Sequence, residues 1–317
     1  MQNMPGLDEL FERRQTYPDF EPQERLARLV GLDDQKSRLT KILGLMVNPQ
    51  GLEKWAARFH ATEARPLLDV ILRRPPLVVL AGDVGSGKTE LAETIGDAVA
   101  RQEDIDITLF PLSLATRGQG RVGEMTQLLS AAFEHTVQAA SKLKGDRKAK
   151  GGIILLVDEA DALAQSREAA QMHHEDRAGV NAFIRGIDRL ANLRLPAAVI
   201  MCTNRLNALD PALRRRAADI LAFARPNREQ RLHILSLRLG PLGVSKEQLQ
   251  MLVEATDGTS DVPGFTFSDL TQRLLPAIAL DAYPNKPVEG MRAVQIAKAM
   301  TATPAFRDEV LAEKVAR

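Results

Sequence analysis

A glycine-rich segment near residue 85 constrains the fold of this chain more than any other feature. The segment Gly82-Asp83-Val84-Gly85-Ser86-Gly87-Lys88-Thr89 fits the pattern GxxxxGK[ST]. It follows an apolar run at residues 77–81 and precedes a helical pattern of apolar residues. A strand, a glycine-rich curl and a helix N-terminus together point backbone N–H groups at phosphate oxygens. The sequence therefore predicts a phosphate-binding loop, with a strand before it and a helix after it.

The residue types of this loop suggest the role of each position. Lys88 is expected to reach the β- and γ-phosphates, and the Thr89 hydroxyl is expected to bind Mg²⁺. The other expected nucleotide contacts come from the curled backbone, at Gly82, Val84, Gly85, Ser86 and Gly87.

Four short apolar runs organise the first two thirds of the chain. They cover residues 77–81, 105–112, 153–157 and 197–202, and most of them are continuous aliphatic stretches. Such runs are typical of strands that are buried on both faces. Amphipathic helical patterns separate them. Strands that alternate with helices form βαβ units, so the sequence predicts an α/β fold with a parallel sheet covered by helices on both faces.

Two acidic residues, Asp158 and Glu159, follow the run at residues 153–157. Ligands of open α/β sheets bind at the carboxyl ends of the strands. Asp158 is therefore expected to bind Mg²⁺, directly or through water. Glu159 is expected to polarise the water that attacks the γ-phosphate. Two acids at this place could instead cap a following helix.

Polar and basic residues follow the run at residues 197–202. Asn204 could orient the attacking water, although an asparagine at a strand end is also a common turn former. Arginines occupy positions 214–216, after a turn at Asp210 and Pro211. They favour an arginine finger that neutralises charge developing on the γ-phosphate, and a solvated basic corner is the alternative.

The composition excludes several classes of protein. The chain of 317 residues has 42 Lys and Arg against 41 Asp and Glu, a net charge of +1, so its bulk charge favours neither nucleic acid nor an anionic membrane. Aromatic residues make up 4%, too few for a base-stacking platform. The single cysteine, Cys202, cannot form an intramolecular disulfide, and no apolar run is long enough to span a bilayer. We expect a soluble, cytoplasmic protein that binds neither nucleic acid nor membrane directly.

Changes in pattern divide the chain into three parts. Residues 1–28 carry several prolines and are expected to form a short arm, with an amphipathic helix near residues 7–11. Residues 29–226 are expected to form the large α/β nucleotide-binding domain. Helical patterns follow at residues 230–239, 246–255 and 267–283, and from 291 to the end, with no strand-like run. Residues 227–317 therefore predict a small all-helical lid domain.

The order of these motifs resembles that of the AAA+ ATPases. The phosphate loop, Asp158-Glu159, Asn204, the arginines after Asp210 and a helical lid follow one another as in that family. The segment at residues 29–34, Leu-Val-Gly-Leu-Asp-Asp, also resembles the family's adenine-binding segment. The resemblance implies a P-loop ATPase that uses ATP and Mg²⁺, with Val30 and Gly31 beside the adenine.

The same resemblance implies an assembly and a further site residue. AAA+ proteins are usually hexameric rings in which ATP lies between subunits. The chain is thus expected to form a homohexamer in which Arg215 or Arg216 acts on the neighbour's nucleotide. The family also has a sensor-2 arginine on a lid helix, and Arg273 is the best match to it.

Within AAA+ proteins, three segments resemble the pachytene-checkpoint-type remodellers of HORMA-domain proteins. They are residues 181–188, Ala218-Asp219-Ile220 after the arginines, and Arg273 with the Leu-Leu-Pro that follows. The chain resembles the compact bacterial form associated with CD-NTases, the cyclic-oligonucleotide synthases of antiphage defence. The resemblance implies that it disassembles a complex of a HORMA protein with a CD-NTase and so dampens second-messenger signalling.

The predicted first pore loop differs from that of related motors. Those motors place an aromatic residue there, whereas this chain has Arg121 and Val122 in the corresponding positions. Two arginines in a glycine-rich loop could grip carbonyls or acidic side chains. A second pore loop is expected at residues 165–177.

The alternative functions are a generic AAA+ unfoldase and a nucleotide-dependent DNA loader or initiator, which would use the basic segment at residues 141–150.

Overall fold

The chain divides into two compact units. The computed structural model describes residues 10–11, 13–60, 64–114, 124–145, 148–161, 163, 174–205, 209–260 and 262–305, without the side chains of residues 174–177. The first unit comprises residues 1–28, 32–81 and 89–222, and the second comprises residues 29–31, 82–88 and 223–317. The phosphate loop therefore belongs to the same unit as the helical C-terminal part of the chain.

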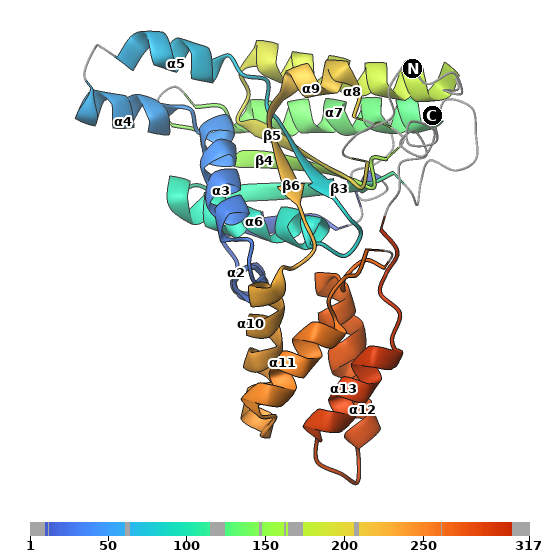
Figure 1. Ribbon diagram of the computed structural model, residues 1–317. Coiled ribbons are helices and arrows are strands. Elements are labelled where there is room, and N and C mark those ends of the chain that lie inside the picture. Colours follow the sequence, from blue (N-terminus) through green and yellow to red (C-terminus); the bar gives the residue numbers. More distant parts are fainter. Residues whose placement is uncertain are drawn as a thin grey trace. The chain divides into compact units, whose positions relative to one another are not determined.

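A six-stranded sheet forms the centre of the first unit, in the order β1-β3-β4-β5-β2-β6 (Figure 1). Its strands are β1 (Gln15–Tyr17), β2 (Leu77–Gly82), β3 (Ile107–Ser113), β4 (Gly152–Asp158), β5 (Ala197–Thr203) and β6 (Ala217–Phe223). The four strands from β3 to β2 are parallel, and β1 is antiparallel to β3. All four predicted apolar runs form these parallel strands, which confirms the predicted α/β class.

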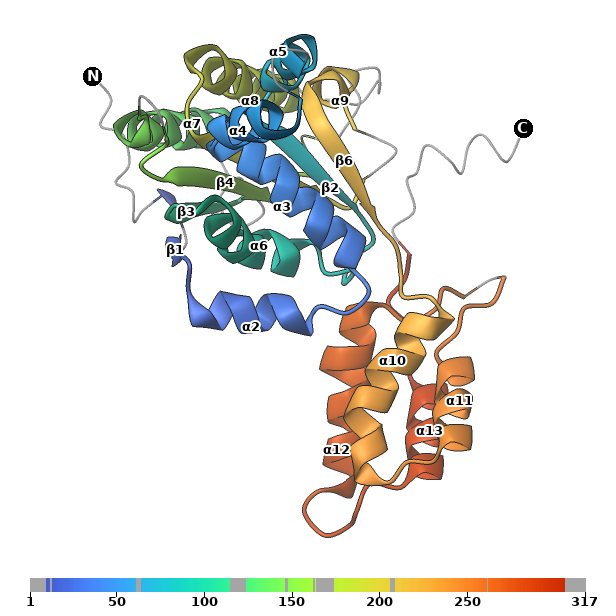
Figure 2. The same cartoon turned by 90° about the vertical axis from the view of Figure 1, so that its left-hand side faces the viewer.

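Helices cover both faces of the sheet (Figure 2). Helices α7 (Glu124–Leu143) and α8 (His174–Leu193) cover one face, and α3 (Asp33–Val47) and α6 (Lys88–Glu103) cover the other. Alternate residues of the strands point to opposite faces, and both sets are buried. This two-sided burial explains the continuous apolar runs of the sequence. The unit also contains α2 (Phe20–Arg28), α4 (Gln50–Phe59), α5 (Arg65–Leu72) and α9 (Pro211–Arg216).

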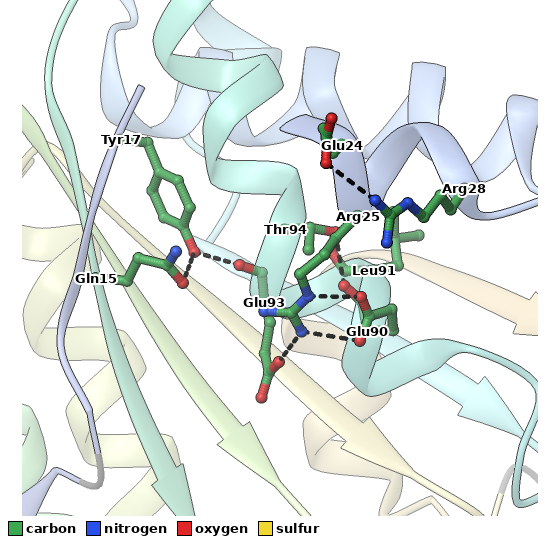
Figure 3. Close-up of polar contacts among 9 residues, drawn as sticks. All are labelled: Gln15, Tyr17, Glu24, Arg25, Arg28, Glu90, Leu91, Glu93 and Thr94. Atoms are coloured by element: carbon green, nitrogen blue, oxygen red, sulfur yellow. Dashed lines mark hydrogen bonds and ion pairs between the residues drawn. The ribbon is translucent and has the colours of Figure 1, made fainter. Parts of the chain in front are cut away.

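The segment before residue 29 packs against helix α6 (Figure 3). The Tyr17 side chain of β1 is fully buried, and its hydroxyl donates to the backbone carbonyl of Glu93 in α6. Arg25 of α2 forms ion pairs of 2.8 Å with Glu90 and 2.7 Å with Glu93. The sequence predicts an arm at residues 1–28, whereas the described part of this segment supplies an edge strand and a helix that hold α6. The helix expected near residues 7–11 lies mostly outside the described residues.

The C-terminal part of the second unit is helical, as expected. It contains α10 (Arg228–Leu239), the short turn η2 (Gly240–Leu242), α11 (Lys246–Ala255), the π-helical turn η3 (Asp269–Leu274), α12 (Leu275–Ala282) and α13 (Gly290–Ala299). Leu235, Leu252 and Leu270 are fully buried in its core. None of the helices in the described part of the chain has the length and apolar character needed to span a bilayer.

The last helix is shorter than the sequence predicted. The helical pattern from residue 291 was expected to continue to the end, but α13 ends at Ala299 and residues 301–305 are not helical. The backbone N–H and the hydroxyl of Thr303 donate to the Asp269 carboxylate, at 3.0 and 2.7 Å. Pro304 also disfavours a helical conformation at the residue before it. Thr303 thus donates to the Asp269 side chain instead of continuing the hydrogen bonds of α13.

Candidate functional site

The glycine-rich segment forms the loop that the sequence predicted, between the end of β2 and the first residue of α6. Gly85 has φ of 72°, a left-handed conformation that glycine adopts without strain. The Lys88 side chain is buried, and its ammonium donates to the backbone carbonyls of Gly82, at 2.9 Å, and Asp83, at 2.8 Å. A buried cation and a helix N-terminus in one curl of backbone form a site for an anion of high charge.

Asp158 and Glu159 lie where β4 ends, at the same sheet edge as the ends of the parallel strands β2, β3 and β5. The Asp158 Oδ1 accepts the backbone N–H of Glu159 at 2.8 Å, and Glu159 has φ of 54°. A left-handed conformation at a non-glycine residue carries strain, and such strain recurs at functional sites. The Glu159 Oε2 accepts the hydroxyl of Ser113, the last residue of β3, at 2.7 Å. Ser113 therefore fixes the carboxylate of the predicted general base.

Asn204 follows β5 and is held by an acid, Asp161, that no sequence motif predicted. Asp161 accepts three hydrogen bonds: from the Thr203 hydroxyl at 2.8 Å, the Asn204 backbone N–H at 2.7 Å and the Asn204 Nδ2 at 3.0 Å. Because Nδ2 is bound to Asp161, the side-chain oxygen of Asn204 is the atom presented to accept a hydrogen bond. Asp161 stands three residues after Asp158, and that proximity was the only sequence signal for it.

The three consecutive arginines differ in their surroundings. They end α9, whose first turn is capped by Asp210 through a 2.7 Å hydrogen bond from the Ala212 N–H. Arg216 forms a bidentate pair with Asp188 of α8, at 2.8 and 2.9 Å, and this hydrogen bonding raises the pKa of the guanidinium. Arg214 and Arg215 are exposed, and neither forms an ion pair with any described residue. Arg216 is thus fixed by Asp188, while Arg215 is exposed.

The predicted adenine-binding segment belongs to the second unit. Gly31 has φ of 72°, and its carbonyl accepts a 3.0 Å hydrogen bond from the Gln230 side chain. Gln230 also completes the capping box that begins α10, together with Asn227. Val30 packs against the apolar core of this unit. The sequence pattern predicted a role for Val30 and Gly31 but not for Gln230, which fixes the segment.

Arg273, the predicted sensor-2 residue, lies in η3 with its side chain 45% exposed. Its Nη1 donates to Oδ1 of the fully buried Asp269 at 2.5 Å. Asp269 also accepts the backbone N–H of Thr266 at 3.0 Å. The position of Arg273 thus depends on a carboxylate that binds several other groups.

Comparisons with known proteins agree with this geometry. The family described as "ATPase family associated with various cellular activities (AAA)" matches residues 78–225, which include the phosphate loop, Asp158, Asn204 and the arginines. The chain is 69% identical to CD-NTase-associated protein 6 of Escherichia coli strain MS 115-1 over 96% of this chain and 98% of that protein. The chain belongs to the CD-NTase-associated protein 6 family of AAA ATPases.

Two solved structures support this assignment. A chain in the structure of the E. coli MS115-1 HORMA:CdnC:Trip13 complex has 67% sequence identity and a TM-score of 0.88, and the match covers 96% of this chain and 100% of that one. The structure of Rhizobiales Trip13 has 57% identity and a TM-score of 0.72, covering 93% of this chain and 99% of that one. The predicted resemblance to HORMA-associated AAA+ proteins is therefore confirmed, and nucleotide binding is expected of every member of the AAA family.

The predicted pore residues of this chain lie outside the residues that the structure describes. Arg121 and Val122 lie outside the described residues, and so does most of the second predicted pore loop, since the described chain resumes at His174. Their role stays a prediction. The described part of the chain contains no cluster of three or more His, Cys, Asp and Glu residues that could hold a metal. A magnesium ion here would instead depend on one carboxylate, one hydroxyl and the phosphates, which is the usual mode for this ion in nucleotide sites.

Proposed function

We propose that this chain is a Mg²⁺-dependent ATPase that forms a homohexamer and uses ATP hydrolysis to remodel a HORMA-domain protein. The observation that best supports hydrolysis is the pair of fixed polar side chains at the sheet edge. Ser113 orients the Glu159 carboxylate, and Asp161 orients the Asn204 amide. A protein that only binds a nucleotide needs neither a positioned base nor a positioned amide.

Each step of hydrolysis has a group in this chain to perform it. Lys88 and the loop backbone would bind the phosphates, Thr89 and Asp158 would hold Mg²⁺, and the ion would neutralise charge on the phosphate oxygens. Glu159 would accept hydrogen bonds from the attacking water and polarise it. Asn204 would accept another hydrogen bond from that water through its side-chain oxygen. Together they would align the water with the γ-phosphate.

The arginines support action between subunits. Of the two arginines that the family resemblance marks, Arg215 is exposed and Arg216 is held by Asp188, so Arg215 is the one that can extend to a neighbouring nucleotide without breaking an ion pair. We assign Arg215 as the finger and Arg216 as the residue that fixes the end of α9. Ring assembly would place the Arg215 guanidinium against the γ-phosphate of the next subunit, where it would stabilise the transition state.

The proposed substrate rests on similarity. The relative in the HORMA:CdnC:Trip13 structure shares 67% of its sequence with this chain. We infer that this chain also engages a HORMA protein bound to a CD-NTase, separates the two and thereby dampens second-messenger signalling in the cytoplasm. Neither the near-neutral charge nor the described basic residues favour a DNA loader over this function.

A phosphate-release assay tests the ATPase. Glu159→Gln should bind ATP and assemble normally but lose at least about a hundredfold in turnover, since general acid–base catalysis contributes about that much. Ser113→Ala should lose less, and Ser130→Ala, at an exposed serine of α7 that bonds only its own helix, should match the wild type. Full turnover by Glu159→Gln would refute the assignment of the base.

Mixed rings test the arginine finger. Arg215→Ala should be inactive alone, and mixing it with Glu159→Gln should restore some turnover, because one kind of mixed interface has both an intact base and an intact finger. No recovery at any mixing ratio would contradict action between subunits.

A release assay tests the remodelling function. The purified E. coli MS115-1 HORMA:CdnC complex should dissociate on a sizing column after incubation with this chain, ATP and Mg²⁺, but not with Glu159→Gln. An intact complex beside normal ATP turnover would favour a general unfoldase with another substrate.

A further inference from the structure

The phosphate loop carries an acidic residue, Asp83, directly after its first glycine. A carboxylate beside bound phosphates would repel them, and the repulsion is strong where solvent is excluded. The Asp83 side chain is 23% exposed and that of its partner, Arg225, is 15% exposed. The Arg225 Nε donates to the Asp83 Oδ2 at 2.8 Å. An arginine from the segment after β6 thus neutralises the acid of the loop.

The same guanidinium binds two other parts of the second unit. Its Nη1 donates to the carbonyl of Gly264 and, at 2.9 Å, to the carbonyl of Thr303. Its Nη2 is buried and has no hydrogen-bond partner among the described residues. Arginine stays charged at every accessible pH and presents its donors in a fixed plane, so it suits a junction of this kind.

A continuous series of polar contacts extends from this junction to Arg273. Thr303 donates two hydrogen bonds to Asp269, and Asp269 accepts another from Arg273. The loop also contacts η3 directly, because the backbone N–H of Ser268 donates to the Gly85 carbonyl at 3.1 Å. A Cβ on Gly85 would lie 2.8 Å from the Ser268 Cβ, so the two segments touch closely.

We propose that Arg225 is a positioning residue for nucleotide binding. It cancels the charge of Asp83 in the phosphate loop, and through Thr303 and Asp269 it ties the loop to the arginine of η3. The segment after α13 is then part of the nucleotide site, although no sequence motif marks it. The inference rests on the proposed ATPase function, since it assumes that the loop binds a nucleoside triphosphate.

The test is a charge-specific mutant cycle, read out by titration with the non-hydrolysable analogue adenylyl imidodiphosphate and Mg²⁺. Arg225→Gln should weaken binding by about tenfold or more, because it removes a cation that pairs with the Asp83 carboxylate. Asp83→Asn alone should change affinity by less than about threefold. The double variant should recover most of the affinity lost in Arg225→Gln, since the repelling charge is gone.

Salt and a matched control separate charge from folding. The deficit of Arg225→Gln should shrink at high ionic strength, as an electrostatic repulsion does. Arg292→Gln removes an arginine that pairs with Asp281 on the surface of the same helical region, and it should bind like the wild type. Thermal melts identify any variant that has lost its fold.

A second variant tests the part of Thr303. Thr303→Val removes the hydroxyl that binds Asp269 and should weaken binding severalfold, whereas Thr271→Val, which removes a hydroxyl bonded to the Phe267 carbonyl, should not. Wild-type affinity in Arg225→Gln, or no recovery in the double variant, would overturn the proposal while leaving the ATPase assignment intact. Absence of binding by the wild type would instead overturn the proposed function itself.

Discussion

Replacing Asp269 with asparagine should destabilise the helical part of the second unit. The Asp269 side chain is fully buried and accepts four hydrogen bonds, from the N–H of Thr266, the N–H and hydroxyl of Thr303, and Arg273. Burial alone would raise the pKa of this carboxyl, but the hydrogen bonds outweigh it and lower the pKa from 3.8 to about 2. The folded state therefore strongly favours the ionised form.

The magnitude follows from that pKa. A shift of one unit corresponds to about 1.4 kcal/mol, so a shift of nearly two units corresponds to roughly 2–3 kcal/mol between the ionised and protonated forms. Asparagine keeps one oxygen but turns an NH₂ group toward backbone donors, which leaves a buried N–H unpaired. We expect Asp269→Asn to lower the free energy of unfolding by about 2–4 kcal/mol at pH 7.

The pH dependence has a definite sign. Because the folded pKa lies below the unfolded value, the contribution of this carboxylate is complete above about pH 4 and is lost as the pH falls toward about 2. Urea unfolding followed by circular dichroism at pH 7 and pH 3 measures it. Between these pH values, the wild type should lose about 1 kcal/mol more than Asp269→Asn.

A control in the same region sharpens this measurement. Asp281→Asn removes an exposed acid that pairs with Arg292, and it should change the stability by less than about 1 kcal/mol. If Asp269→Asn matched the control at pH 7, or if it kept the full acid sensitivity of the wild type, the hydrogen-bond network would not stabilise the unit as argued.

Two further predictions concern the edges of the nucleotide-binding machinery. Tyr17→Phe keeps the buried ring but removes the hydroxyl that binds the Glu93 carbonyl, so thermal unfolding should show a loss of about 1 kcal/mol, and an unchanged stability would contradict the role of that bond. Gly31→Ala should weaken nucleotide binding, because the added Cβ would lie 2.3 Å from the Gln230 Nε2. Gly243 also has a positive φ, of 88°, but open space around it, so Gly243→Ala tests backbone strain without a clash. Equal effects of the two substitutions on nucleotide binding would contradict the clash.

The sequence predicted the elements that carry local signals. The apolar runs predicted the four parallel strands, and the glycine pattern predicted the loop that joins β2 to α6. Two edge strands, β1 and β6, were missed. The first has only three residues. The second contains an apolar run at residues 220–223 that follows Asp219 directly, and this run was not recognised as a strand.

The sequence also predicted candidate catalytic groups, because their residue types at strand ends are distinctive. The partners of those groups escaped prediction. Ser113, Asp161 and Asp188 are ordinary polar residues that become significant only when the fold brings them to Glu159, Asn204 and Arg216. A sequence pattern relates residues that are near each other along the chain, whereas these contacts join residues on different elements.

The sequence by itself thus determined the α/β class, the glycine-rich loop and the polar residues that follow the strands. Only the tertiary structure decided which side chain fixes which. It paired Arg225 with Asp83 across 142 positions of sequence and Thr303 with Asp269 across 34. Burial makes such pairs matter, since an ionised group removed from water must find its partner within the fold. Which residues pair depends on how the chain folds, so no periodic pattern in the sequence predicts these pairs.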